Sequence, residues 1–325
     1  MNRTWKKISA IAILGLALTA CGNSENSSEG DSDFTVGATQ IVEHPSLDAA
    51  YEGFQEALKD ADLEVDYKFY SAQGDPNNSQ ANAENLVADQ VDLIFANSTP
   101  SAQSALQATN SIPIVFTSVT DAVAGELVTS MDEPGENITG VVDLHPDTIQ
   151  YTVDFIEEYF PGSSIGMIYN AGEANSVTQI SLVHEAVEGT SLSIIERSVA
   201  SSAEVHQAAT SLAPEVDAFY IITDNTVVSA LDSVVQVADD EGKPLFVGEP
   251  DSLEKGGFAT FGIDYFSIGY RSGEMAAQIL KGESTTSDIP VEYPQDMQLF
   301  INKTAADAQG VEWNSDWDES AELVE

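Results

Sequence analysis

The chain has 325 residues but a single cysteine, Cys21, and its four histidines are far apart. One cysteine cannot form a disulfide within the chain or build a cysteine-based metal site. The histidines show none of the spacings that metal ligands have on a shared helix or turn. They are His44, His145, His184 and His206. We therefore expect no disulfide, no metal site and no cofactor.

Basic residues are also scarce, with 11 Lys and Arg against 54 Asp and Glu and a formal net charge of −43. A nucleic-acid-binding protein needs a basic surface, and this chain would repel phosphate. Nucleic acid is thus excluded as a partner. Salt screens the repulsion between like charges on a surface. We interpret the acidity as an adaptation to a salty or alkaline medium rather than as a device for binding a particular cation.

Catalytic motifs are absent from the sequence as well. Gly162-Ser163-Ser164-Ile165-Gly166 fits the pattern Gly-x-Ser-x-Gly, but it precedes a predicted strand, whereas a nucleophile elbow follows one. No glycine-rich loop leads to a lysine that could hold a phosphate. We expect no catalytic residues, and a protein that is not an enzyme.

What the sequence does have is a leader. Basic residues at positions 3, 6 and 7 precede an apolar run over 8–18, which is too short to span a membrane comfortably. Leu18-Thr19-Ala20-Cys21 then has the lipobox pattern. Residues 1–20 are predicted to be a lipoprotein signal peptide, and a lipid on Cys21 is predicted to anchor the protein at the extracytoplasmic face of the cell membrane. Ordinary secretory cleavage beside a chance cysteine is the alternative. The polar residues 21–33 are predicted to form a flexible tether.

From residue 34 onward, short apolar runs with strand character alternate with amphipathic helical patterns. This alternation predicts an α/β fold with doubly wound parallel sheets. Residues 90–99 and 215–226 resemble each other, and each is followed by a helix and a strand that begins near a proline, which indicates two similar lobes. The strands are predicted at 34–41, 63–70, 91–96, 112–116, 165–169, 192–197, 216–222 and 244–247, with later ones at 257–264 and 297–301.

Polar side chains follow the carboxyl ends of these strands, where open α/β sheets bind ligands. The candidate ligand-binding residues are Glu43, His44, Asn97, Ser98, Thr99, Thr120, Asp121, Asn170, Asn175, Ser176, Asp224, Asn225 and Asp251. Several have a simpler alternative. Glu43 and His44 could be solvated loop side chains, and helix capping is the alternative for Asn97, Ser98, Thr99, Asn175, Ser176 and Asp251. Phe116, Tyr169 and Tyr265 are candidates to face an apolar ligand group, or else core residues.

None of the basic residues outside the leader falls in these loops. A ligand carboxylate would then be held by backbone N–H groups and hydroxyls at helix starts. A ligand ammonium would have carboxylates available, and Asp224 is the favoured one, because it follows a buried strand and would otherwise be desolvated without an ionic partner.

Six segments in order resemble the ABC transporter substrate-binding lipoproteins of the tryptophan/tyrosine-type family, over about residues 34–310. They are residues 40–48, 97–103, 116–121, 169–176, 223–226 and 262–265. The resemblance implies a type I periplasmic-binding-protein fold with two lobes, three crossovers and an amino acid in the cleft. We expect lobe 1 over 34–143 plus 251–288, lobe 2 over 144–250 plus 289–311, and an acidic surface tail over 312–325.

The predicted function is that of a lipid-anchored solute-binding component of an ABC importer. It would be a monomer that closes its two lobes around an amino acid, aromatic like tryptophan or tyrosine, and presents it to a permease and its ATPase. Two alternatives stay open. One is another small solute, such as a branched-chain amino acid or a nucleoside. The other is a receptor that reports ligand occupancy to a sensor kinase or chemoreceptor.

Overall fold

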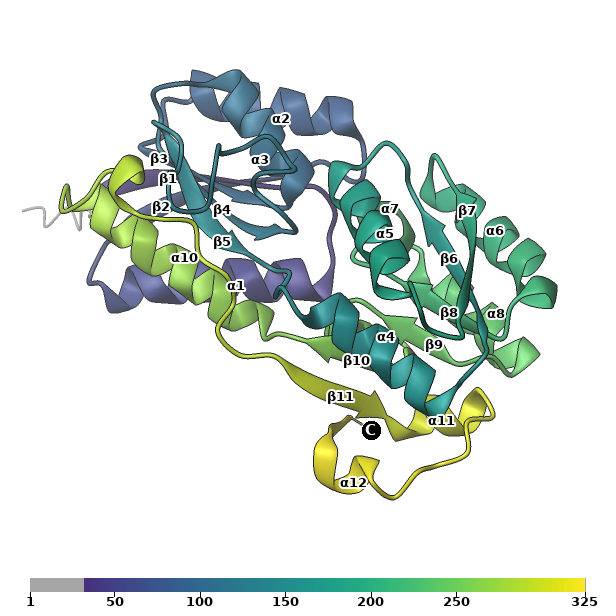
Figure 1. Ribbon diagram of the computed structural model, residues 1–325. Helices are drawn as coiled ribbons and strands as arrows, with labels where there is room; N and C mark the ends of the chain where they lie inside the picture. Colours follow the sequence, from purple (N-terminus) through teal and green to yellow (C-terminus); the bar gives the residue numbers. More distant parts are fainter. Residues whose placement is uncertain (1–31, 325) are drawn as a thin grey trace, which may run out of the picture. The chain divides into compact units, whose positions relative to one another are not determined.

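Residues 32–324 are described by the computed structural model, and two β-sheets form their framework (Figure 1). The predicted signal peptide, Cys21 and most of the predicted tether lie outside the described residues. Over 32–324, no helix has the length and apolar character needed to cross a membrane.

The first sheet has five parallel strands in the order β2-β1-β3-β4-β5. We call this sheet and the helices packed on it lobe 1. Its elements are β1 (Phe34–Gln40), α1 (Pro45–Asp60), β2 (Val65–Ser71), α2 (Pro76–Ala88), β3 (Leu93–Asn97), α3 (Thr99–Ala108), β4 (Ile114–Val119), β5 (Ile138–Val142), α10 (Tyr265–Leu280) and the 3-10 turn η3 (Thr286–Asp288).

The second sheet has seven strands in the order β12-β11-β10-β9-β8-β6-β7, and with its helices it forms lobe 2. Its first elements are α4 (Thr148–Tyr159), β6 (Ser164–Tyr169), α5 (Ala174–Ala186), β7 (Ser193–Ser198), η1 (Ser202–Glu204), α6 (Val205–Leu212), η2 (Ala213–Glu215), β8 (Ala218–Ile221) and α7 (Asn225–Val228). The remaining ones are α8 (Leu231–Glu241), β9 (Leu245–Val247), α9 (Asp251–Glu254), β10 (Ala259–Gly262), β11 (Gln298–Asn302), α11 (Lys303–Ala308), α12 (Trp317–Ser320) and β12 (Glu322–Val324).

Five strands of lobe 2 repeat the order of lobe 1, with β7-β6-β8-β9-β10 matching β2-β1-β3-β4-β5. The prediction of two similar doubly wound lobes is confirmed. In each lobe the chain adds its second strand on one side of the first strand and its later strands on the other side. Open α/β sheets bind ligands at such a switch point, outside the carboxyl ends of the strands. Both lobes therefore offer a binding edge of the same kind.

The chain passes between the two sheets three times, and two of the predicted lobe boundaries need correction. Strand β10 pairs with β9 and β11, so residues 251–262 belong to lobe 2 and the return to lobe 1 begins at Ile263 rather than at 251. The Val142 N–H donates to the Glu292 carbonyl, so the last crossover follows Glu292 rather than residue 288. Strand pairing, which decides these boundaries, leaves no local sign in the sequence.

The acidic tail over 312–325 is also not the surface flap that its composition predicts. Its last strand, β12, pairs with β11, and the Trp317 side chain is 2% exposed. The Trp317 ring lies 5.7 Å from that of Phe155 and 5.6 Å from that of Phe258. Burial of so large an apolar side chain stabilises by about 2–3 kcal/mol, which anchors a segment whose acids stay in solvent.

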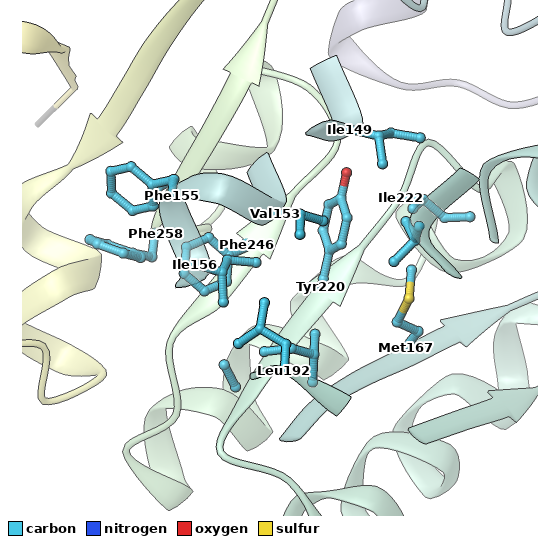
Figure 2. Close-up of a cluster of buried hydrophobic side chains, with 14 of the residues drawn as sticks. Ile149, Val153, Phe155, Ile156, Met167, Leu192, Tyr220, Ile222, Phe246 and Phe258 are labelled. Carbon is cyan, nitrogen blue, oxygen red and sulfur yellow. The ribbon is translucent and has the colours of Figure 1, made fainter. Parts of the chain in front are cut away.

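The core of lobe 2 that receives this tryptophan is rich in aromatic side chains. Figure 2 shows Phe155 and Phe258 at one end of the cluster and Met167 and Ile222 at the other, with Tyr220 between them. These side chains come from α4 and from central strands, which are apolar on both faces because helices cover both.

In lobe 1, α1 and α10 lie alongside each other at unusually short range (Figure 1). A Cβ atom on Gly269 would lie 1.9 Å from the Ala50 carbonyl oxygen, and one on Gly53 would lie 2.1 Å from the Phe266 carbonyl oxygen. Only glycine permits this approach. The contact fixes the starts of both helices, which carry His44 and Tyr265, at the edge where the sheet ends.

Candidate functional site

A narrow cavity of about 30 Å³ is lined by residues that follow strands of both lobes. The lining residues are Val42, His44, Ser46, Leu47, Ser118, Thr120, Asp143, Asn175, Thr223, Asp224, Asn225, Val228, Glu249 and Tyr265. Three of them carry carboxyl groups, and none is Lys or Arg. The cavity thus has an excess of acidic groups, which favours a ligand with positive charge.

Five of the predicted residues line this cavity: His44, Thr120, Asn175, Asp224 and Asn225. The Asn175 side-chain amide donates to the Thr223 carbonyl at 3.1 Å, while its Oδ1 is buried without a partner in residues 32–324. Thr120, in lobe 1, accepts a 3.3 Å hydrogen bond from Gln179 of α5, in lobe 2. Thr120 therefore both lines the cavity and links the two lobes.

The predicted residues after β3 do not line the cavity. The Asn97 amide donates to the Leu47 carbonyl at 2.7 Å, which ties the end of β3 to α1. Ser98 caps α3 by accepting from the Ser101 N–H, and Thr99 is buried at the start of the same helix. For Ser98 the capping alternative describes what the structure shows. Asp121 likewise accepts from the Val123 and Ala124 N–H groups in a turn.

The other predicted residues lie around the cavity rather than on it. Glu43 is exposed and borders a separate surface depression. Asn170 lines a wider opening of about 780 Å³ that Asn225 also borders. Ser176 donates to Asp224 at 2.7 Å from behind, and Asp251 accepts a 2.7 Å hydrogen bond from Ser46. Ser176 and Asp251 therefore support lining residues, whereas Glu43 and Asn170 border other openings.

Five polar lining residues were missed by the sequence analysis: Ser46, Ser118, Asp143, Thr223 and Glu249. Ser118 and Thr223 lie within the loop segments that carry the family resemblance, so their neighbours signalled them. Asp143 and Glu249 each come just after a short apolar strand, β5 and β9, and that position was the available signal. Ser46 also lies within a segment that carries the resemblance, residues 40–48, in the first turn of α1.

His44 offers a hydrogen-bond donor to the cavity. Its Nδ1 accepts from the Ser46 N–H at 3.3 Å and so caps α1. A neutral imidazole with an acceptor at Nδ1 carries its proton on Nε2. Burial lowers the pKa of His44 to about 4, with a smaller contribution from Lys255, so the ring is neutral at pH 7. The Nε2–H group has no hydrogen-bond partner in residues 32–324, and its nearest carboxylate oxygen, on Glu249, is 3.8 Å away.

Ser46 connects α1 of lobe 1 to two carboxyl groups of lobe 2. Its hydroxyl oxygen lies 2.6 Å from Glu249 Oε2 and 2.7 Å from Asp251 Oδ2. One hydroxyl hydrogen can serve only one of these contacts, so the other needs a proton on a carboxyl group. Burial raises the pKa of both Glu249 and Asp251, which agrees with a shared proton. This contact joins the lobes beside the cavity.

Asp224 is fully buried, and its two carboxylate oxygens are already occupied. Oδ2 accepts from the Asn170 N–H at 2.6 Å and from the Ser176 hydroxyl at 2.7 Å, while Oδ1 accepts from the Val227 N–H at 2.8 Å and caps α7. Burial, helped by the nearby carboxylate of Glu173, raises the pKa of Asp224 to about 6. Its hydrogen bonds hold three segments of lobe 2 together.

Asp143 is held differently, in the crossover between β5 and α4. Its Oδ2 accepts from the Tyr265 hydroxyl at 2.9 Å, and its Oδ1 is buried with no partner among the described residues. Burial raises the pKa of Asp143 to about 6, against the opposing effect of the Tyr265 hydrogen bond. Tyr265 starts α10 just after another crossover, so this pair joins two of the three connections between the lobes.

Ser118 has a left-handed backbone, with φ of 56°, at the end of β4 where the register with β5 shifts. Such a conformation costs on the order of 1 kcal/mol for a residue with a side chain. Its hydroxyl is buried in the cavity wall without a partner in the described part of the chain. A strained residue with an unused hydroxyl is typical of a ligand contact.

Of the three aromatic candidates, only Tyr265 lines the cavity. Phe116 is fully buried in the core of lobe 1, and Tyr169 packs on the core of lobe 2. The apolar walls are instead formed by Val42, Leu47 and Val228 with the Tyr265 ring. Residues 32–324 contain no cluster of His, Cys, Asp and Glu that could hold a metal ion. The cavity combines an apolar surface with unpaired donors and acceptors, which is typical of a small-molecule site.

Comparison with known proteins decides the family. The family model of the ABC transporter substrate binding protein matches residues 35–324, nearly all of the described chain. The chain belongs to this family. The two lobes of this substrate-binding protein have the type I periplasmic-binding-protein fold that the resemblance implied. The relatives are substrate-binding proteins rather than enzymes.

Several relatives of this substrate-binding protein are similar over most of their length. A tyrosine-binding protein of Clostridioides difficile (strain R20291) is 36% identical, over 92% of this chain and 90% of the relative. A Streptococcus protein solved in complex with L-Trp is 31% identical, with a TM-score of 0.85 over 90% of this chain and 100% of that one. A substrate binding protein with adhesive properties from Clostridium difficile, in its ligand-free, open structure, is 37% identical, with a TM-score of 0.66 over 90% and 99%.

Proposed function

We propose that this protein is the extracytoplasmic binding component of an ABC importer for an aromatic amino acid, with tyrosine and tryptophan as its expected ligands. The chemistry of the cavity carries the proposal. It presents carboxylates and no cationic side chain, so an ammonium group completes its charge. Its neutral donors, His44 Nε2–H and the Ser118 hydroxyl, suit a carboxylate. An α-amino acid carries both groups.

The relatives favour the aromatic class. One is named for tyrosine binding, and another was solved with L-Trp. The apolar wall of Val42, Leu47, Val228 and the Tyr265 ring suits a flat hydrophobic side chain. We infer that the aromatic ring of the ligand lies against this wall.

Closure of the two lobes is the proposed mechanism of capture. This protein has a TM-score of 0.85 with the L-Trp complex but only 0.66 with the ligand-free, open relative, although the latter is more identical in sequence. The contacts of Ser46 with Glu249 and of Gln179 with Thr120 join the lobes directly. In the proposed cycle these contacts form as the ligand is enclosed, and a permease with its ATPase receives the closed form.

Isothermal titration calorimetry tests the ligand class. L-tyrosine and L-tryptophan should bind at least tenfold more tightly than leucine, uridine or glucose. Mass spectrometry of ligand released from the protein purified without added amino acids gives an independent identification. Release of a sugar or a nucleoside, together with no heat of binding for either aromatic amino acid, would contradict the proposal.

The lipid anchor is a separate part of the proposal and rests on Cys21 in the sequence. A lipoprotein carries two or more acyl chains, whereas a single chain gives only marginal membrane binding. Cys21→Ser should therefore release a folded protein from the membrane fraction into the medium or periplasm. Membrane fractionation with an immunoblot measures this, and unchanged fractionation of the variant counts against lipidation.

A further inference from the structure

The cavity has two aspartates that could receive the ammonium group of an amino acid, and their hydrogen bonds differ. Asp224 accepts three hydrogen bonds from its own lobe through both oxygens. Asp143 accepts one side-chain hydrogen bond, from Tyr265, and its Oδ1 has no partner in residues 32–324. A buried carboxylate oxygen without a partner is costly, so a native protein retains one where a ligand completes it.

The charges around Asp143 point in the same direction. The groups that face it are the Tyr265 hydroxyl at the start of α10 and the Glu249 carboxyl after β9. Neither is a cation, and His44, the basic lining residue, is neutral because burial lowers its pKa to about 4. Among residues 32–324, no Lys or Arg lines the cavity. The positive charge that Asp143 lacks must therefore come from the ligand.

Asp143 lies in a connection between the two lobes, so a ligand bound to it would contact that connection. Asp143 lies directly after β5, in the first crossover, and its N–H donates to the Val119 carbonyl at 3.0 Å. Tyr265 lies directly after the second crossover, which leaves β10. A group bound to this pair touches the connections that bend when the lobes move, rather than one wall of the cavity.

We propose that Asp143 Oδ1, held in place by the Tyr265 hydroxyl, receives the α-ammonium group of the bound amino acid. Asp143 is the ammonium-specific contact in this scheme, and Tyr265 is its positioning residue. This inference rests on the proposed amino-acid function. It replaces the expectation, drawn from the sequence, that Asp224 pairs with the ammonium.

The test compares two ligands that differ only in this group: L-tryptophan and indole-3-propionate, which has no ammonium. Calorimetry should show that the wild-type protein binds L-tryptophan more tightly. Asp143→Asn should lower the affinity for L-tryptophan about 10- to 100-fold and leave that for indole-3-propionate within about threefold, because a hydrogen bond to a charged group is lost for one ligand only. Asp92→Asn makes the same charge change outside the cavity and should alter neither affinity.

Asp224→Asn separates the two aspartates. If Asp224 only holds the wall of lobe 2, its loss should weaken both ligands by a similar factor and keep their ratio. Tyr265→Phe should reduce the ratio severalfold, and it tests the proposal by the same measure even if Asp143→Asn does not fold.

An unchanged ratio in Tyr265→Phe, or in a folded Asp143→Asn, overturns the proposal. If only Asp224→Asn abolished the preference for L-tryptophan over indole-3-propionate, Asp224 would be assigned as the partner of the ammonium group. If the wild-type protein binds neither tryptophan nor tyrosine, the proposed function itself fails, and that outcome is distinct from the other two.

Discussion

Each of two sides of the cavity carries a buried aspartate, and the two aspartates differ in their hydrogen bonds. On the side formed by lobe 2, Asp224 accepts three hydrogen bonds from residues 170, 176 and 227 and so completes the fold of its own lobe. On the side formed by the crossovers, Asp143 is held by one tyrosine hydroxyl, and its Oδ1 has no partner in the described part of the chain. Burial raises the pKa of both to about 6. A perturbed pKa therefore does not distinguish a structural carboxylate from one reserved for a ligand, whereas the count of its partners does.

The largest expected effect concerns the helix pair that carries the crossover side. Gly269→Ala would bring a Cβ to 1.9 Å from the Ala50 carbonyl oxygen, so α10 must move away from α1 and take Tyr265 with it. We expect a loss of about 2–3 kcal/mol in the free energy of unfolding, measured by urea denaturation.

Gly166→Ala in lobe 2 is the matched control for Gly269→Ala. Its new Cβ would meet the end of the flexible Leu212 side chain at 2.8 Å, and that side chain can yield. A smaller loss is expected there. Equal losses for the two variants would show that the α1–α10 contact is not specially tight.

A second prediction sets Asp224→Asn against Asp143→Asn in the ligand-free protein. An asparagine at 224 has only one acceptor oxygen, so at least one of the buried donors at Asn170, Ser176 and Val227 loses its partner. The loss should be about 1–3 kcal/mol of unfolding free energy. An asparagine at 143 can still accept the hydrogen bond from Tyr265, and no neighbouring donor loses its partner. Asp143→Asn should therefore leave the free energy of unfolding unchanged or raise it.

The pH dependence of these stabilities has a definite sign. The pKa of the Asp143 carboxyl is about 6 in the folded protein against 3.8 ordinarily, so ionisation reduces folded stability as pH rises through 6. Any advantage of Asp143→Asn in melting temperature should therefore appear above pH 6 and fade below pH 4. An advantage that grows toward low pH would contradict the assignment.

A third prediction concerns ligand affinity as a function of pH. Asp143 must be ionised to receive an ammonium group, and its pKa of about 6 means that it takes up a proton between pH 7 and 5 in the free protein. The affinity for L-tyrosine should fall by about tenfold over that range. Calorimetry at several pH values measures this, and Asp143→Asn should flatten the curve while Asp224→Asn keeps its slope. If both variants kept the wild-type slope, the pH dependence of the affinity would be assigned to Glu249 or Asp251 instead.

The smallest expected effect is that of salt on the melting temperature, and it should be the same for variants on either side of the cavity. Salt screens charges on the surface far better than buried ones. With 54 acidic residues in the chain, the melting temperature should rise by about 2–4 °C as NaCl increases from low to molar concentration. Wild type, Asp143→Asn and Asp224→Asn should shift alike. A shift confined to one variant would mean that its cavity wall is open to ions.

Much of this architecture follows from local signals. The strand at 34–41 and the apolar spacing of Leu47, Ala50, Phe54 and Leu58 predict β1 and α1 closely, because buried residues must repeat with the period of the element that buries them. The resemblance between 90–99 and 215–226 also reflects a real equivalence, since β3 and β8 occupy the same place in their sheets. His44, Asn175 and Asp224 were found because polar residues after buried strands meet at one edge.

What the sequence could not determine depends on contacts between distant residues. Which of Asp224 and Asp143 has an oxygen without a partner in the described residues depends largely on distant donors, such as Ser176, 48 positions from Asp224, and Tyr265, 122 positions from Asp143. The burial of Trp317 likewise depends on a pocket formed by Phe155 and Phe258, which no local pattern announces. The sequence by itself determined most of the strands and longer helices, the two similar lobes and the edge where polar residues gather, because these follow from periodicity along the chain. Only the tertiary structure decided which polar groups at that edge are already satisfied, because hydrogen bonds are completed across the fold.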